Sequence, residues 1–212
     1  KPDGTKMWQI SGNRIYESTL NIPWSFSSVT SDTTNLKYSI TYDHYDLHWK
    51  PDGTRVFFCT DGSDSDADGV LSYDLGTPWD TSTLIGQTRK FHNVNANDAT
   101  PRGVTLSDDG TKMFINGDGN NIVYRYNLSS AWDVTTASYA SDSYVYYNQC
   151  TNPRACVIRD GGTKFYTVDD GATQRVSQFN LSTPYDLSTM KPSGEYITYD
   201  PDGQEGILTG VD

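Results

Sequence analysis

The chain has 212 residues and a formal net charge of −11 at pH 7, with a sequence pI of about 4.5. This acidity excludes nucleic acid as a partner, because nucleic-acid binders carry a basic patch, and it argues against an anionic membrane surface. No apolar run approaches the roughly 18 residues that a membrane span needs. The chain contains 15 Tyr, 7 Phe and 5 Trp, which indicates a folded β-rich protein and not a disordered one.

A short turn sequence recurs along the chain. Each copy has an Asp-Gly or Gly-Gly pair followed by Thr, a basic residue and an apolar stretch. The glycines that mark the copies are Gly4, Gly53, Gly110 and Gly162. A second marker is an aromatic residue that follows a leucine by four positions. The aromatic residues of this marker are Trp24, Trp79, Trp132 and Tyr185. Two independent markers with one period of about 53 residues indicate an internal repeat, which decides the fold class before any single motif does.

Each repeat unit is predicted to hold four short strands. In the third unit these strands are residues 103–106, 112–115, 122–126 and 143–147, with an Asp-Gly turn after the first and a Gly-Asp-Gly-Asn turn after the second. Such turn residues tolerate positive φ. A four-strand repeat of roughly 40 to 55 residues is typical of a β-propeller blade. We therefore predict an all-β propeller over residues 1–212, with about four four-stranded blades or four blades of a larger ring.

The Asp-Gly-Thr-Lys turns and the segments 73–80 (YDLGTPWD) and 179–186 (FNLSTPYD) carry a resemblance to a known family. They resemble the β-propeller repeats found in secreted bacterial, phage and environmental surface proteins. The resemblance covers nearly the whole chain. It implies a propeller fold and a location outside the cell, on a cell surface or on a virion surface. It implies little about activity, because propellers host many functions.

The second unit carries an acidic hairpin, which is the first candidate site along the chain. Asp64, Asp66 and Asp68 alternate before Gly69, as in the opening of a calcium-binding loop, and alternating carboxylates can converge on one hard cation. The position where such a loop has its closing Glu holds Leu75, so Asp74 or a residue of a neighbouring loop is the predicted substitute. The alternative is a solvated acidic hairpin without a metal ion.

Two arginines precede the first strands of the third and fourth units. Arg102 and Arg154 each follow a proline, and the repeat places them near the mouth of the central channel. The hairpins between second and third strands lie on the same face. We expect ligands on this face, where an arginine can bind a carboxylate or a sugar. The alternative is that both arginines pair with the nearby aspartates. The Asp-Gly turns lie on the opposite face and are predicted to be structural.

The remaining candidates concern modification and packing. Cys150 and Cys156 flank a five-residue loop and can form a disulfide in an oxidising compartment, or they can be buried apolar residues. Asn127 and Asn180 open glycosylation sequons at equivalent positions. The recurring tryptophans suit packing between units, with sugar stacking as the alternative. The three histidines do not form a zinc-ligand pattern, and we identify no catalytic constellation.

The two ends of the sequence are complementary. Lys1 opens on a turn with no first strand before it, whereas residues 206–212 resemble a first strand with no turn behind it. Within one molecule this predicts ring closure by the tail. Between molecules it predicts strand exchange, which joins subunits head to tail. Further blades beyond both ends are the third interpretation.

These observations predict a non-enzymatic extracellular structural or adhesive module. It would be a subunit of a surface filament or phage appendage, with other copies or neighbouring structural subunits as partners. The alternative is a propeller that binds glycans or receptors with the help of Ca²⁺. A lactonase-type hydrolase is a third interpretation, but the expected first strands offer mainly apolar residues and few metal ligands.

Overall fold

The computed structural model describes residues 1–12, 14–30, 43–62, 67–146, 150–171 and 174–198. Its strands form four antiparallel sheets, one for each repeat unit, and the all-β propeller prediction is confirmed. Blade 1 comprises β1 (Lys6–Ser11), β2 (Arg14–Leu20) and β3 (Val29–Thr30), and blade 2 comprises β4 (Asp43–Trp49), β5 (Arg55–Asp61), β6 (Gly69–Leu75) and β7 (Leu84–Asn93). Blade 3 comprises β8 (Pro101–Leu106), β9 (Lys112–Gly117), β10 (Ile122–Leu128) and β11 (Ala137–Val145), and blade 4 comprises β12 (Pro153–Arg159), β13 (Lys164–Asp169), β14 (Arg175–Leu181) and β15 (Met190–Thr198).

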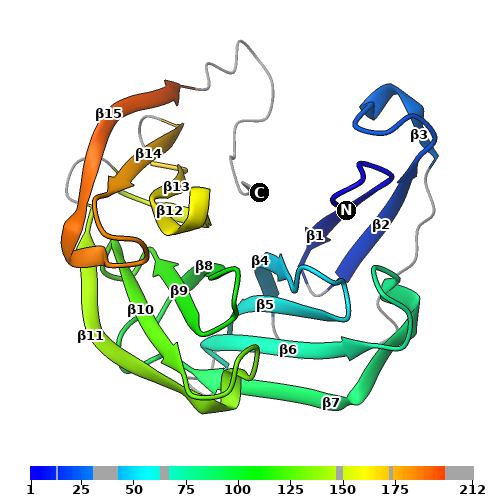
Figure 1. Ribbon diagram of the computed structural model, residues 1–212, viewed down its shortest axis with the longest axis horizontal. Coiled ribbons are helices and arrows are strands. Elements are labelled where there is room, and N and C mark those ends of the chain that lie inside the picture. Colours follow the sequence, from blue (N-terminus) through cyan, green and yellow to red (C-terminus); the bar gives the residue numbers. More distant parts are fainter. Residues whose placement is uncertain (13, 31–42, 63–66, 147–149, 172–173, 199–212) are drawn as a thin grey trace.

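The blades follow one another around a centre (Figure 1). Strands β4, β8 and β12 are innermost in their sheets, and all three contact one another. Blade 1 differs, because its first strand, β1, corresponds to the second strands β5, β9 and β13. Residues 206–212, which were predicted to supply a first strand, lie outside the described residues.

The two markers of the repeat form one structural unit. The turn aromatics Trp24, Trp79, Trp132 and Tyr185 have positive φ angles of 61 to 64°. Each donates its backbone N–H to the carbonyl oxygen of the marker glycine in its own blade, at 2.9 to 3.0 Å. Each ring lies so close over that glycine that a Cβ there would stand 2.2 to 2.6 Å from it. Glycine and aromatic residue therefore recur together because each requires the other.

An aspartate fixes the chain after three of these aromatic residues. Its carboxylate accepts a hydrogen bond from the backbone N–H two residues later, at 3.0 to 3.1 Å, and so caps a single-turn 3₁₀ helix. The capping residues are Asp80, Asp133 and Asp186, and the helices are η2 (Thr81–Thr83), η3 (Val134–Thr136) and η6 (Leu187–Thr189). In blade 1 the corresponding residue is Ser25, whose side chain does not cap the helix η1 (Phe26–Ser28). The capping explains why Trp-Asp or Tyr-Asp recurs.

The hydrophobic core lies mainly between the blades. One cluster joins blades 1 and 2, a second joins blades 2 and 3, and a third joins blades 3 and 4. Ile15 and Phe58 belong to the first, Phe57 and Met113 to the second, and Phe114 to the third. Each blade is therefore stabilised by its neighbours, as expected for a repeat whose units cannot bury both faces alone.

Candidate functional site

The two candidate ligand-binding arginines belong to an ionic ladder across the hairpin face. Arg102 pairs with Asp61 of blade 2 at 2.5 Å and with Asp118 of its own blade at 3.1 Å. Arg154 pairs with the same Asp118 at 3.1 Å and with Asp170 of its own blade at 3.1 Å. Each guanidinium thus links its own blade to the preceding one. The geometry matches the alternative interpretation, in which the arginines pair with aspartates.

The ladder is partly shielded from water. Arg102 also lies 4.0 Å from the centre of the Tyr45 ring, and Tyr45 occupies in blade 2 the position that the arginines hold in blades 3 and 4. Burial disfavours the charged form of Arg102, but Asp118 and Asp61 outweigh burial and raise the pKa of the guanidinium. The arginine therefore stays charged and holds two carboxylates that would otherwise repel each other.

The acidic hairpin is only partly described, since Asp64 and Asp66 lie outside the described residues. Asp68 is buried and accepts a hydrogen bond from the backbone N–H of Gly62 at 3.2 Å. Burial raises the pKa of Asp68, and the neighbouring Asp61 raises it further. Within the described ranges no group of three or more His, Cys, Asp or Glu side chains is placed to hold a metal ion.

Asp74 does not belong to this hairpin. It lies near the opposite end of β6 from Asp68, on the order of 20 Å away for an extended strand, and it pairs with Arg55 at 2.6 Å. The prediction that Asp74 closes a calcium site is therefore wrong. The predicted calcium ligands reduce to Asp64, Asp66 and Asp68.

The predicted disulfide is also wrong. Cys150 and Cys156 are free thiols, and so is Cys59; all three are buried. Cys150 and Cys156 pack in the cluster between blades 3 and 4, and burial raises the pKa of both thiols. The alternative interpretation, in which the cysteines are small apolar core residues, matches this environment.

The two sequons are accessible. Asn127 on β10 and Asn180 on β14 are exposed, and their serines, Ser129 and Ser182, are exposed as well. Both asparagines occupy the same place in their blades, so both remain candidates for glycosylation.

A carboxylate that the sequence analysis overlooked lies at the centre of the propeller. Asp46 on β4 is buried, and its Oδ1 accepts the backbone N–H of Leu47 at 2.9 Å. Its Oδ2 accepts the backbone N–H of Val104 in blade 3 at 3.0 Å and that of Cys156 in blade 4 at 3.5 Å. One carboxylate therefore links three blades. The signal was present in the repeat alignment, where the equivalent residues are the small Gly103 and Ala155.

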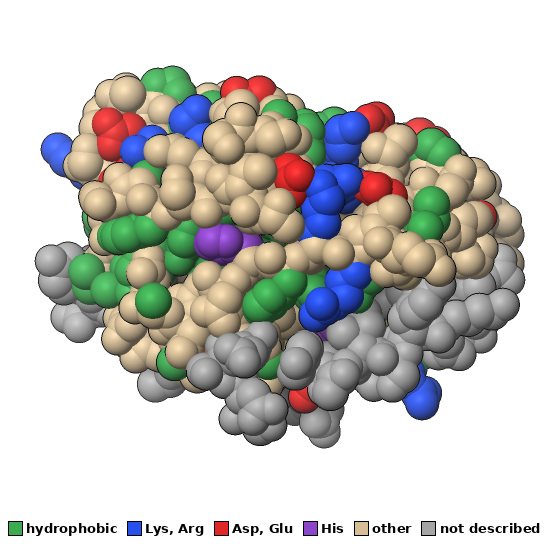
Figure 2. All heavy atoms as spheres, turned by 90° about the horizontal axis from the view of Figure 1, so that it is seen from below, with side chains coloured by type: hydrophobic (Ala, Val, Ile, Leu, Met, Phe, Trp, Pro, Cys, Tyr) green, Lys and Arg blue, Asp and Glu red, His purple; other side chains and the backbone are tan. Residues whose placement is uncertain are grey.

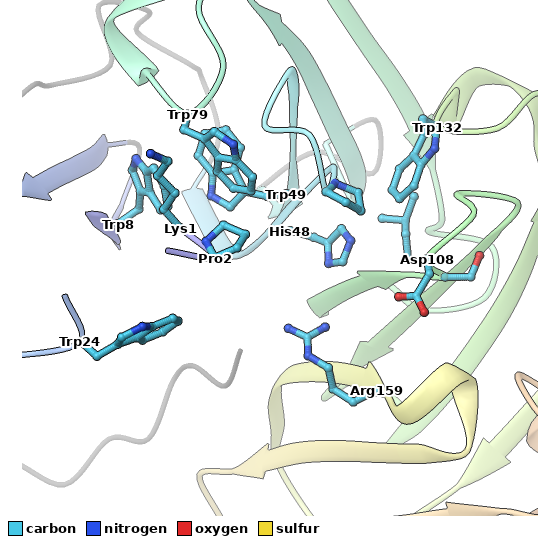
Figure 3. A pocket seen from close by; sticks show the side chains of 13 residues that line it. Lys1, Pro2, Trp8, Trp24, His48, Trp49, Trp79, Asp108, Trp132 and Arg159 are labelled. Atoms are coloured by element: carbon cyan, nitrogen blue, oxygen red, sulfur yellow. The ribbon is translucent and has the colours of Figure 1, made fainter. Parts of the chain in front are cut away.

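A pocket of about 450 Å³ opens on the face of the Asp-Gly turns (Figure 3). All five tryptophans of the chain line it, from blades 1, 2 and 3: Trp8, Trp24, Trp49, Trp79 and Trp132. The rings of Trp8, Trp49 and Trp79 pack against one another with centroids 4.6 to 5.8 Å apart. In Figure 3, Asp108 and Arg159 lie across the pocket from the group of Trp8, Trp49 and Trp79. The turn face, which was predicted to be structural, thus carries a cavity as well.

The outer side of the molecule carries mixed charge. Figure 2 shows basic side chains beside acidic ones on the side viewed from below. Among the ion pairs between blades, Lys90 of blade 2 pairs with Asp133 of blade 3 at 2.5 Å. Within the described part of the chain, no helix is long and apolar enough to cross a membrane.

Comparison with known proteins supports the fold. No family model and no curated protein matches the sequence. Among solved structures, the chain is similar to one in a nidogen/laminin complex, with a TM-score of 0.59, 11% identity, and coverage of 89% of this chain and 61% of that chain. It is also similar to a candidate 6-phosphogluconolactonase from Bacteroides uniformis, with a TM-score of 0.54, 13% identity, and coverage of 92% and 55%.

A luciferin-regenerating enzyme gives a TM-score of 0.51 at 18% identity, with coverage of 89% of this chain and 59% of that chain. The chain thus spans 55 to 61% of the length of these three similar structures. At such low identity the likeness concerns the fold alone. Together with the radial sheets, it places the protein in the class of β-propellers.

Proposed function

We propose that the protein is a non-enzymatic structural or adhesive propeller module outside the cell, and a subunit of a surface filament or phage appendage. The repeat resemblance, the acidic net charge of −11 and the use of Asp46, Arg102 and Arg154 to join blades support this role. The observation that carries the proposal is that, within the described residues, the inner edge of β1 is not paired with another strand.

Strands β5, β9 and β13 each pair with an inner strand, namely β4, β8 and β12. Among the described residues, no strand pairs with the corresponding edge of β1. A groove of about 720 Å³ lies there, lined by Met7 and Gln9 of β1 and by Tyr45 and Leu47 of β4. An open strand edge is a template for pairing with another strand. Residues 206–212, whose sequence resembles a first strand, are the proposed occupant, supplied by another copy.

The test is the particle size of the purified 212-residue chain, measured by multi-angle light scattering and negative-stain microscopy with and without a chelator. We expect fibres or oligomers well above the monomer mass of 23.6 kDa. Their loss in chelator would implicate Asp64, Asp66 and Asp68. A 23.6 kDa particle at every concentration would contradict the proposal and favour closure of the ring by the chain's own tail.

The pocket on the turn face favours a second function, glycan binding with or without Ca²⁺. Aromatic rings give large, rigid contact area, and concave sites usually combine such an apolar lining with a few polar groups. Here the indoles supply the apolar lining, and Ser107, Asp108 and Arg159 lie on its border. An oligosaccharide with both apolar ring faces and hydroxyl groups matches this composition.

Glycan binding has a direct readout, because every tryptophan of the chain lines the pocket. We expect a neutral hexasaccharide from a panel of cello-, malto-, manno- and chito-oligosaccharides to change the intrinsic fluorescence in a saturable way. Asp108→Ala should weaken binding about tenfold, the scale of one lost hydrogen bond to a charged group. Asp160→Ala is the matched control, since Asp160 is the equivalent residue of blade 4 and lies outside the pocket. An unchanged spectrum at millimolar sugar would exclude this function.

A further inference from the structure

The three junctions between blades share one aromatic contact. In each junction, the residue four positions after the marker glycine packs against the turn aromatic of the next blade. The pairs are Trp8 with Trp79 at 5.8 Å, Phe57 with Trp132 at 6.1 Å, and Phe114 with Tyr185 at 6.3 Å between ring centroids. The repetition defines how one blade of this protein recognises the next.

A basic residue contributes to the same junctions, two positions after the marker glycine. Lys6 donates to the carbonyl oxygen of Trp79 at 3.2 Å, and Arg55 donates to that of Trp132 at 2.6 Å. In the third junction, the ammonium group of Lys112 lies 5.5 Å from the ring centre of Tyr185. Each blade thus presents a basic residue and an aromatic ring to the turn aromatic of the next blade.

The two end blades carry the two halves of this contact. Blade 4 has Lys164 and Tyr166 at the basic and aromatic positions. Blade 1 has the turn aromatic Trp24. This residue is 72% exposed, whereas Trp79, Trp132 and Tyr185 are partly buried. Ile22 and Phe26 beside it are 61% and 77% exposed. Three large exposed apolar side chains within five residues favour an interaction site at this side of blade 1.

We infer that the exposed side of blade 1 docks against blade 4 of a second copy, with Trp24 on Tyr166 and Lys164 near Trp24. The contact rests on the proposed structural role and specifies its second interface, beside the edge of β1. The chain's own blade 4 does not cover Trp24, which stays exposed in its presence, and Figure 1 shows β2 and β3 of blade 1 on the opposite side of the view from β14 and β15 of blade 4. The occupant is a second copy because the three internal junctions already show that such surfaces fit each other.

This docking has two physical consequences. A contact between different surfaces of identical subunits is head to tail, so it produces a ring if the rotation closes and a filament if it does not. Each copy also carries a net charge of −11, so long-range repulsion opposes association. Added salt screens that repulsion over about 10 Å or less at 0.1 M and above, and we expect association to strengthen as salt increases.

A crosslinking pair follows from the junction of blades 1 and 2. There Thr81, two residues after Trp79, donates its hydroxyl to Glu17 at 2.8 Å, and Glu17 is the β2 residue opposite Trp8. On the exposed side of blade 1, the equivalent of Thr81 is Phe26, two residues after Trp24. On the outer side of blade 4, the equivalent of Glu17 is Gln178, which is opposite Tyr166. Cysteines at these two positions leave Trp24 and Tyr166 intact.

The experiment mixes Phe26→Cys protein with Gln178→Cys protein and adds a short dithiol-reactive crosslinker. We expect a crosslinked dimer of the two variants, increasing with salt. The native cysteines provide little background, because they are buried and burial raises their pKa. Tyr139→Cys is the control partner, since Tyr139 is exposed on β11 of blade 3, which is neither of the two docking blades.

Trp24→Ser in the otherwise native chain should weaken association at least about tenfold, as for an interface anchor.

The outcomes separate this inference from the proposed function. Assemblies that form without the Phe26→Cys/Gln178→Cys crosslink, and that persist in Trp24→Ser, would overturn the docking and leave the structural role in place. A monomer without crosslinks would overturn both. A crosslink within one chain of the double variant, and none between chains, would replace the second copy by the chain's own blade 4.

Discussion

Gly162→Ala is expected to lower the free energy of unfolding by about 3 kcal/mol, whereas Gly161→Ala should lower it by only about 1 kcal/mol. The two glycines are neighbours in one turn, and both have positive φ, +62° for Gly161 and +86° for Gly162. A Cβ on Gly162 would lie 2.6 Å from the Tyr185 ring, whereas a Cβ on Gly161 meets nothing within 4 Å. Both variants pay for left-handed backbone, but only Gly162→Ala must displace a packed ring.

Urea unfolding followed by circular dichroism measures both losses on the same chain. Gly161→Ala serves as the internal control for the backbone term. Equal losses would show that the ring over the glycine adds nothing, and the explanation given for the recurring glycine–aromatic pair would have to be abandoned. The same reasoning applies to Gly53 and Gly110, where Trp79 and Trp132 approach the virtual Cβ within 2.3 and 2.2 Å.

This coupling explains why the fold could be predicted from the sequence. At the marker glycines, positive φ favours glycine and the ring above leaves no room for a side chain, so residues close in sequence determine the geometry of the turn. Four copies at a similar spacing then leave few architectures other than stacked or radial sheets. The capping aspartates, such as Asp80, strengthen the pattern because they too act within a few residues.

The sites were harder to predict because they depend on contacts between distant segments. Asp74 was grouped with Asp68 by spacing along the chain, but an extended strand separates them. Cys150 and Cys156 were paired by proximity in sequence, whereas the fold buries both as thiols. The tryptophan pocket combines the repeat positions of Trp8, Trp24, Trp79 and Trp132 with Trp49, and their spacing along the chain does not show that they line one cavity.

Asp46 is the clearest example, since its role depends on two other blades. Asp46→Ala is expected to lower the free energy of unfolding by about 3 to 5 kcal/mol, because it leaves buried N–H groups of Val104 and Cys156 without their acceptor. Asp46→Asn, which keeps one side-chain oxygen, should lose roughly half as much. Asp43→Ala is the matched control: Asp43 lies on the same strand and is exposed, so its loss should stay within about 0.5 kcal/mol.

Urea unfolding of the three variants, followed by tryptophan fluorescence, checks the order Asp46→Ala, Asp46→Asn, Asp43→Ala. The fluorescence is informative because the tryptophans line a pocket formed by several blades, so it reports loss of the radial arrangement. Circular dichroism on the same samples reports the strands. If Asp46 joins the blades, both signals should shift together to lower urea, since each blade depends on its neighbours for its core. An Asp46→Ala midpoint equal to that of Asp43→Ala would show that the central carboxylate is dispensable, and that the hydrophobic clusters and ion pairs between the blades hold them together without it.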